Sequence, residues 1–298
     1  MKIVDPHMHL CNLKAIRYPW LTSPRTDWFI GPYHSLANTH ELSDFLREAG
    51  EIQVLKIIHI ENGVEPADRV KESSWLQSTA DDPESSGRPN GIVAAADLSR
   101  SDVESTLEAH KAFPNVRGIR QILNVHQDPF YDFVGYQFMH DSAWQAGFTL
   151  LHKFDLSFDL QVYPSQMLDA ATLAKRNPDT TIILNHTGMF VDRSTLAGWQ
   201  AWRDGIVAMA ANPNVMVKIS GMGMIDHAWT IESIRPYVLQ TIDTFGVDRC
   251  MFASNFPVDR LFGSYSALWH AFDSCVAGFS EREKEKLFRT NAERSYRI

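Results

Sequence analysis

One pattern recurs eight times along the sequence: a short apolar run rich in Val and Ile, followed by a stretch with helical spacing. The runs are nearly continuous in apolar residues, as in IVAAADL and TIILNH, which is typical of strands covered on both faces of a parallel sheet. The predicted strands are Lys2–Leu10, Gln53–Ile60, Gly91–Leu98, Val116–Leu123, Ser157–Tyr163, Thr180–His186, Val215–Ser220 and Arg249–Ser254.

A helix is predicted after every strand, and a further helix closes the chain. The predicted helices are Thr39–Ala49, Pro66–Gln77, Ser101–Ala112, Met139–His152, Pro164–Lys175, Ser194–Ala211, Thr230–Phe245, Tyr265–Val276 and Ser280–Arg297. Eight alternating units predict an α/β fold, a (β/α)8 TIM barrel formed as a single domain by residues 1–298. The alternative is an open doubly wound sheet, but the turn after its first strand normally carries glycines, and residues 9–13 contain none.

Composition narrows the classes of partner and compartment. The chain has 28 Lys and Arg against 36 Asp and Glu, a net charge of −8, and no basic block, so we expect no nucleic-acid partner. No apolar stretch approaches the roughly 18 residues of a membrane span, and we expect no membrane role. Three cysteines without a C-x-x-C motif are typical of reduced thiols, and we expect a cytoplasmic protein.

Polar residues gather where the predicted strands end, which is where a TIM barrel carries its active site. His7 and His9 have strand spacing, so their imidazoles point to one face, about 6 to 7 Å apart along the strand. Such a pair suits two ligands of one metal or two contacts to one substrate group. The strand-end residues are Asp5, His7, His9, His59, Glu61, Asp97, Arg120, Gln161, His186, Lys218 and Asn255, with Asp259 four residues further on.

Several segments together resemble the amidohydrolase superfamily, and more narrowly its amidohydrolase-related (amidohydrolase 2) branch of lactonases and decarboxylases. They are IVDPHMHL, LNHTG, VKISG, MFASNFPVD and NAERSYRI, and the resemblance covers essentially the whole chain. It implies that His7, His9 and His186 are site residues. Asn255 stands where the family normally has an aspartate, and Gln161 or a neighbour stands at the fifth-strand ligand position. The resemblance therefore favours the lactonase-like members, which include metal-free enzymes.

From these observations we expect His7, His9, His186, Asn255 and Asp259 to be catalytic. Arg120, Lys218, Gln161 and His59 are the expected substrate-binding residues. No metal or other cofactor is favoured, and the alternative is one divalent ion, zinc, on His7, His9 and His186. Arg120 and Lys218 are embedded in strands, and buried cations need anionic partners. Asp97 or Glu61 could supply these partners inside the protein; otherwise a substrate carboxylate or developing oxyanion does so.

Two long aromatic-rich loops are expected over the mouth of the barrel. The first, Arg17 to Leu36, contains Tyr18, Trp20, Trp28, Phe29 and Tyr33, and the second, Asn124 to His140, contains Phe130, Tyr131, Phe133 and Tyr136. Loops of this kind exclude water and bind organic rings.

The sequence therefore predicts a hydrolase that opens a lactone of a small sugar acid or carboxylic acid by attack of water. His186 is the preferred base, because the amide of Asn255 only positions water. Arg120, Lys218 and the first-strand histidines would stabilise the oxyanion. One alternative is a metal-dependent nonoxidative decarboxylase of an aromatic acid, and another is a non-catalytic barrel that binds a ligand. A homo-oligomer is left open.

Overall fold

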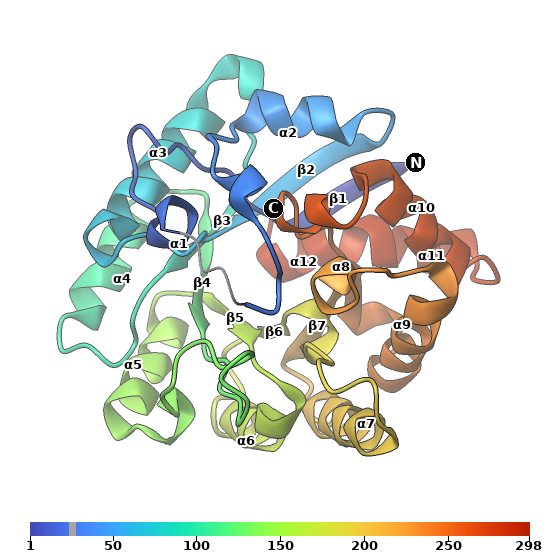
Figure 1. The fold of residues 1–298 in the computed structure, drawn as a ribbon. Helices are drawn as coiled ribbons and strands as arrows, with labels where there is room; N and C mark the ends of the chain where they lie inside the picture. The colour runs from blue at the N-terminus through green and yellow to red at the C-terminus, as the bar shows by residue number, and fades with distance from the viewer. Residues whose placement is uncertain (24–27) are drawn as a thin grey trace.

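Eight parallel strands form one sheet in the order β1 to β8, with each strand hydrogen-bonded to the next in sequence (Figure 1). The computed structural model describes residues 1–23 and 28–298. The strands are β1 (Lys2–Met8), β2 (Gln53–Ile60), β3 (Gly91–Ala95), β4 (Val116–Ile122), β5 (Ser157–Gln161), β6 (Ile182–Leu184), β7 (Val215–Ile219) and β8 (Cys250–Phe252). All eight lie within the predicted runs.

Hydrogen bonds between β1 and the segment after β8 close the sheet into a barrel. The backbone N–H of Asn255 donates to the carbonyl of His7 at 2.8 Å, and that of His9 donates to the carbonyl of Phe256 at 2.7 Å. Met8 and Phe256 form a parallel bridge at the same place. We call these contacts the closing seam. They confirm the predicted TIM barrel.

Helices surround the barrel, as Figure 1 shows, and their apolar faces cover the strands. The longer ones are α2 (Leu42–Ala49), α3 (Arg69–Asp81), α4 (Val103–Lys111), α5 (Ser142–Lys153), α6 (Met167–Arg176), α7 (Leu196–Ala210), α9 (Ile231–Phe245) and α10 (Tyr265–Cys275). Short helices not predicted from sequence are α1 (Pro19–Thr22) and α8 (Met222–Ile225), both in loops after strands. The predicted closing helix is divided into α11 (Glu281–Glu285), a π turn (Lys286–Thr290) and α12 (Asn291–Tyr296).

The Ser280 hydroxyl caps α11 by accepting from the Glu283 backbone, and the Glu283 carboxylate accepts from the Ser280 backbone at 2.8 Å. This is the capping box that the sequence predicts. Inside the barrel, a separate cluster of strand side chains packs with the last helix; it includes Val4, Ile58, Ile183 and Met251, together with Tyr296. The barrel is therefore a packed core and not a channel.

The two aromatic loops pack together in a second apolar cluster, in which Tyr131 of the second loop packs against a group that contains Tyr18, Trp28, Phe29 and Tyr33 of the first. The Trp28 and Phe133 rings lie 5.4 Å apart and join the first loop to the second. Residues 24–27 of the first predicted loop lie outside the described residues.

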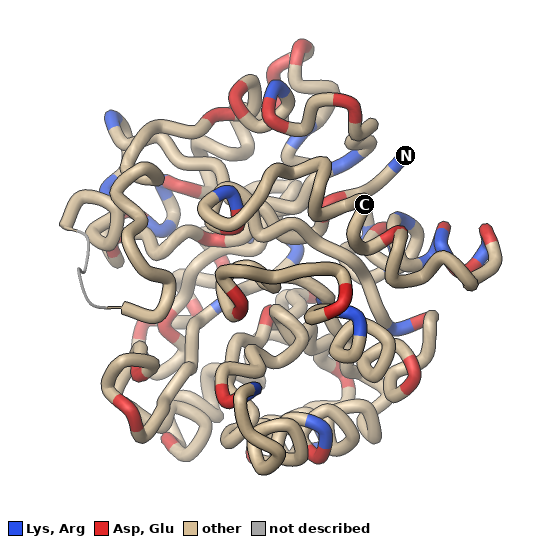
Figure 2. The backbone as a smooth tube through the Cα atoms, turned by 45° about the vertical axis from the view of Figure 1, so that its right-hand side comes forward, with Lys and Arg blue, Asp and Glu red and all other residues tan. Residues whose placement is uncertain are grey.

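In the view of Figure 2, Lys and Arg alternate with Asp and Glu along the outer helices. Among the helices described, none is both long and apolar enough to cross a membrane.

Close packing of α5 against the loop after β3 generates a stability prediction. A Cβ atom on Gly147 would lie 2.0 Å from the carbonyl oxygen of Leu98. We expect Gly147→Ala to lower the free energy of unfolding by about 1 to 3 kcal/mol, although alanine is the better helix former. Chemical denaturation measures this change. Gly278→Ala is the matched control, since nothing lies within 4 Å of its Cβ position, and an equal loss in both variants would contradict the packing argument.

Candidate active site

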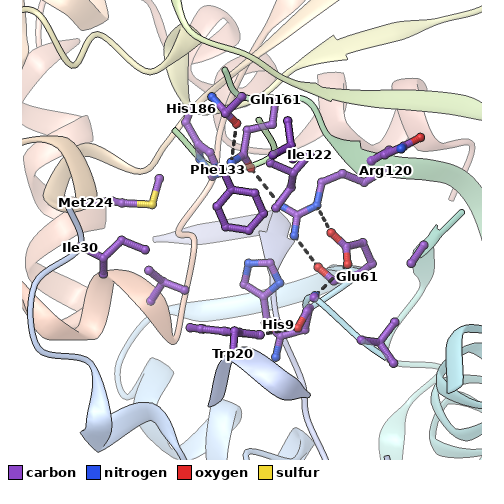
Figure 3. A pocket seen from close by; sticks show the side chains of 18 of the residues that line it. His9, Trp20, Ile30, Glu61, Arg120, Ile122, Phe133, Gln161, His186 and Met224 are labelled. Carbon is purple, nitrogen blue, oxygen red and sulfur yellow. Dashed lines mark hydrogen bonds and ion pairs between the residues drawn. The ribbon is translucent and has the colours of Figure 1, made fainter. Parts of the chain in front are cut away.

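A cavity of about 460 Å³ lies at the carboxyl ends of the strands, where the sequence places the site. Five of the predicted site residues line it, and Figure 3 labels four of them: His9, Arg120, Gln161 and His186. The fifth is Asn255. Aromatic and aliphatic side chains from the loops complete the wall, namely Trp20, Trp28, Phe29, Ile30, Val64, Phe133, Val134, Phe138, Tyr163, Met224 and Val258.

The closing seam sets the positions of His9 and Asn255, because each lies next to a residue whose backbone bonds across it. Asp5, a fully buried residue of β1, reinforces the closing seam from within the core. Its carboxylate accepts hydrogen bonds from the Ser254 backbone and hydroxyl, at 3.0 and 2.6 Å, and from the Tyr265 hydroxyl at 2.9 Å. Asp5 therefore holds β1, β8 and α10 together and does not face the cavity.

Three imidazoles meet at the floor of the cavity, where His9 and His186 line it and His7 lies beneath them. The ring centres of His7 and His9 are 5.1 Å apart, and those of His7 and His186 are 4.5 Å apart. Burial lowers the pKa of all three histidines, and the positive charges of Arg120 and Lys218 lower them further; the pKa of His9 falls to about 3. All three rings are therefore neutral at pH 7.

The proton of His9 has a defined position. Nδ1 of His9 lies 2.8 Å from the carbonyl oxygen of Ile60, which only accepts, so Nδ1 carries the hydrogen. Nε2 of His9 consequently holds a lone pair. In His186, Nδ1 lies 3.0 Å from the Ser220 hydroxyl, which donates or accepts, so this contact does not fix the tautomer.

Arg120 reaches the cavity from β4 and is held by Glu61, which follows β2 (Figure 3). Its Nε donates to the Glu61 carboxylate at 2.7 Å, and its guanidinium also donates to the Glu61 carbonyl and to the Gln161 amide oxygen at 3.2 Å. Further N–H groups remain available, since the guanidinium is rich in donors. The Gln161 amide in turn donates to the side chain of Asn124 at 3.1 Å. Glu61 is thus the internal partner that the sequence proposed for Arg120.

Asn255 adopts a left-handed backbone conformation, with φ of 61°, directly after β8. Asparagine tolerates this region better than most residues, so Asn255 is both a turn former and a cavity residue. Its side-chain amide donates to the Asp259 carboxylate at 3.1 Å. Asp259 lies behind Asn255 and outside the cavity wall, where burial raises its pKa to about 7.

Lys218 and His59 do not reach the cavity wall. Lys218 is fully buried in the barrel and forms an ion pair with Asp159, while its Nζ lies 3.4 Å from Nδ1 of His7. The Tyr296 hydroxyl donates to the same Asp159 carboxylate at 2.9 Å. We expected Lys218 to contact the substrate. In the structure its ammonium group is instead paired with Asp159 inside the core, away from the cavity.

His59 faces away from the cavity. Its Nδ1 accepts a hydrogen bond from the Leu10 backbone at 3.1 Å, and its Nε2 lies 3.8 Å from the buried Glu72 carboxylate. His7 is likewise fully buried and contributes no surface to the cavity, although its ring lies beneath it. Both histidines therefore support the neighbouring wall instead of forming it.

The sequence reasoning did not single out Asp159, Asn124 or Arg69. Asp159 is in the middle of an apolar strand, and the pattern SFDLQ identifies it as a buried acid that needs a cation. Asn124 follows β4 directly, a position at which other strands carry site residues. Arg69 begins helix α3 and lines the cavity, but nothing in its local sequence distinguishes it from a solvated helix residue.

The donor atoms fit a divalent metal poorly. Among the described residues, no group of three or more His, Cys, Asp or Glu side chains has the spacing of a metal site. Asn255, an uncharged amide, follows β8 at the position where the resemblance noted from sequence implies an aspartate, and the positive Lys218 lies beside His7. A positive charge beside the imidazoles, even one paired with Asp159, opposes the binding of a second cation.

The chain matches one protein family over nearly its whole length and is similar to individual bacterial proteins. Residues 4–298 match the family described as Amidohydrolase. The chain is 43% identical over 297 residues, 99% of its length and 98% of the other's, to an uncharacterized protein, y4mH, of Sinorhizobium fredii. It is 28% identical over 219 residues, 70% of each chain, to an L-fucono-1,5-lactonase of Burkholderia ambifaria.

The fold also matches a solved structure along its whole length. The crystal structure of an amidohydrolase from Burkholderia multivorans with bound zinc has a TM-score of 0.80 to this chain at 22% identity, with both chains covered completely. This likeness supports the TIM-barrel assignment for the full set of strands.

Glu72 behind His59 generates a prediction about stability and pH. Burial raises its pKa from 4.5 to about 8, and the nearby Glu61 raises it further. A raised folded-state pKa gives stability that is fully present below about pH 4.5 and is lost as the pH rises through about 8. We expect Glu72→Gln to become more stable relative to the wild type from pH 5 to pH 9, by a few kcal/mol. Thermal unfolding at pH 5, 7 and 9 tests this, and a difference independent of pH would contradict it.

Proposed function

This chain belongs to the amidohydrolase 2 family, and on that premise we propose that it is a hydrolase that opens a lactone, the cyclic ester of a small carboxylic or sugar acid. The observation that carries the proposal is that one cavity contains both the lone pair on His9 Nε2 and the guanidinium of Arg120. A base and an oxyanion donor are what water needs to attack an ester carbonyl. Similarity to an L-fucono-1,5-lactonase supports the same chemistry.

In the proposed first step, His9 accepts a proton from water as the water oxygen attacks the lactone carbonyl. The hydrogen bond from Nδ1 to Ile60 holds the imidazole in the orientation that presents Nε2. The Asn255 amide lies beside His9 and positions the water without accepting its proton. Because burial and Arg120 keep His9 neutral, its lone pair is available over the whole physiological range of pH.

The carbonyl oxygen becomes negatively charged as the tetrahedral intermediate forms, and we place it on the uncommitted N–H groups of Arg120. Glu61 and Gln161 hold the guanidinium fixed before the substrate arrives, so little reorganisation accompanies the reaction. The intermediate collapses as the C–O bond of the ring breaks. His9 then returns its proton to the departing ring oxygen, which becomes the hydroxyl of the open acid.

This assignment moves the base from His186, which the sequence favoured, to His9. The reason is the tautomer: a carbonyl partner fixes the hydrogen of His9, whereas the Ser220 hydroxyl leaves that of His186 undetermined. In our proposal His186, which also lines the cavity, contributes a second polar contact to the substrate. Lys218 and His7 act from beneath, by keeping the imidazoles neutral and oriented.

The decarboxylase alternative needs an anionic metal ligand after β8, and the amide of Asn255 does not provide one. The alternative of a non-catalytic barrel predicts tight ligand binding without turnover. The non-catalytic alternative does not use the lone pair of His9, so variants of this residue separate it from the lactonase proposal.

We expect the purified enzyme to open members of a panel of sugar-acid and aromatic-acid lactones, and to retain this activity after dialysis against a chelator. Acid release at constant pH measures the reaction, and elemental analysis of the same sample measures the metal. Stoichiometric zinc together with loss of activity on chelation would contradict the metal-independent part of the proposal. Failure to open any lactone would contradict the function itself.

His9→Asn should lower kcat by about 10²- to 10⁴-fold, because it removes the base but retains a polar side chain of similar shape. Steady-state kinetics on the best lactone of the panel measure the loss. His270→Asn is the matched control, since His270 is exposed on α10 and pairs with Glu51 far from the cavity. A loss smaller than tenfold in His9→Asn would show that another group accepts the proton.

Asn255→Asp separates hydrolysis from decarboxylation. In a lactonase of the proposed kind, the added carboxylate lies beside Asp259 and should lower activity, because like charges oppose each other at this distance. In a decarboxylase that has lost its metal ligand, the same change should create carbon dioxide release in the presence of zinc. Headspace gas analysis with an aromatic acid distinguishes the two outcomes.

A further inference from the structure

The cavity has a second end, across the mouth from the proposed catalytic residues. His186 follows β6, whereas Arg69 follows β2, four strands away in the barrel of eight. Strands with this separation lie on opposite sides of a closed barrel. Arg69, Asp97 and Gln121 nevertheless line the same cavity as His186. A substrate that fills the cavity therefore meets two chemically different ends.

Within the part of the chain that the structure describes, the Arg69 side chain forms no hydrogen bond or ion pair at this second end. Its Nε atom is buried without a hydrogen bond, and none of the ion pairs formed by the described residues includes it. A buried guanidinium nitrogen without an acceptor is costly, because it has lost its water and gained nothing in return. An unsatisfied donor in a cavity wall indicates a place for an acceptor on a ligand.

The acids in the cavity wall are committed elsewhere. Glu61 binds Arg120 through one carboxylate oxygen and a loop N–H through the other. Asp97 accepts hydrogen bonds from the backbone N–H of Ser99 at 3.1 Å and from its hydroxyl at 2.6 Å. Neither carboxylate pairs with Arg69.

The acids that flank the cavity are committed as well. Asp68, which precedes Arg69 in sequence, accepts from the Arg17 backbone at 3.1 Å and from its guanidinium at 2.9 Å. Asp102 on the neighbouring loop pairs with Arg100 at 2.9 Å. Among the described residues, no carboxylate therefore forms a hydrogen bond or ion pair with Arg69, although Asp97 lines the same end of the cavity and Asp102 acts on Arg69 electrostatically from nearby.

We propose that Arg69 is a specificity-determining residue that binds a carboxylate on the substrate, at the end of the cavity opposite His186. This inference rests on the proposed lactonase function and adds a substrate class to it: a lactone that bears a second, free carboxylate on or near its ring. The reacting carbonyl lies at His9 and Arg120, and the free carboxylate lies at Arg69. The planar guanidinium suits a carboxylate, which it binds through two parallel hydrogen bonds.

Two further features of the structure favour this orientation. Arg69 is the first residue of the 13-residue helix α3, so the positive end of the helix dipole lies at the same place. The wall between the two ends is formed by aromatic side chains such as Trp20, Phe133 and Phe138, which suits a flat ring and repels a charge in the middle. Arg120 does not serve this purpose, because Glu61 already neutralises it.

The test uses matched lactone pairs in which one member carries a ring carboxylate and the other its methyl ester, for example 5-oxotetrahydrofuran-2-carboxylate and its ester. The readout is the ratio of kcat/KM for lactone-ring opening between the two members. We expect the wild type to prefer the carboxylate and Arg69→Gln to reduce this ratio by about 10- to 100-fold, mainly through KM. Arg69→Lys should retain part of the preference. Arg203→Gln, at an exposed arginine on α7 outside the cavity wall, should leave the ratio unchanged.

A wild type without preference for any carboxylate, or an Arg69→Gln variant that keeps the full preference, would overturn the inference. If no lactone is opened at all, the proposed function fails, and binding still tests Arg69. Calorimetry with coumarin-3-carboxylate and with coumarin then compares the same variants. Loss of affinity for the carboxylate alone in Arg69→Gln upholds the subsite, and equal affinity in wild type and variant overturns it.

Discussion

The closing seam between β1 and the end of β8 is the constraint on which the rest of the site depends. Two backbone hydrogen bonds join His7 to Asn255 and His9 to Phe256, so the contacts that close the barrel also fix the side chains that we propose to be catalytic. Asp5 strengthens the seam through Ser254 and Tyr265 from within the core. Closure of the fold and assembly of the site are therefore one event, and a change that opens the seam would disturb both.

Electrostatics inside the barrel explain how neutral imidazoles persist next to two cations. Lys218 is paired with Asp159, and Arg120 with Glu61, so each charge has a local counterion. Burial of the rings and the nearby positive charges of Lys218 and Arg120 lower the pKa of the histidines, which therefore stay unprotonated. The whole chain has a net charge of −8, yet among the described residues that line the cavity Arg69 is a cation without an ion-pair partner. Such an arrangement favours a negatively charged ligand at one end of the cavity.

The sequence predicted the barrel because buried parallel strands leave a strong apolar signal, and it predicted His9, Arg120, Gln161, His186 and Asn255 because strand ends converge in this fold. It did not predict the depth of each residue along the barrel axis. Alternation shows which side chains point inward, but not whether they lie in the mouth or in a deeper layer. Lys218 is the clear example, since it points inward and meets Asp159 in the core.

Two other features, the position of Arg69 and the tautomer of His9, could not be predicted from the sequence for a different reason. The position of Arg69 depends on how the loop after β2 folds back over the mouth, and nothing in the local sequence specifies that path. The tautomer of His9 depends on the carbonyl of Ile60, a backbone group contributed by a neighbouring strand. Contacts between segments far apart in sequence set both, and such contacts become visible only in three dimensions.

Oxygen-18 labelling tests the central claim, attack of water on a lactone carbonyl, most directly. The best lactone is opened in H2 18O by enzyme whose metal content has been measured to be well below stoichiometric, and the product is analysed by mass spectrometry. The account predicts one solvent oxygen in the new carboxylate and the original ring oxygen in the new hydroxyl. Label in the hydroxyl, or release of carbon dioxide in place of a ring-opened acid, would contradict it.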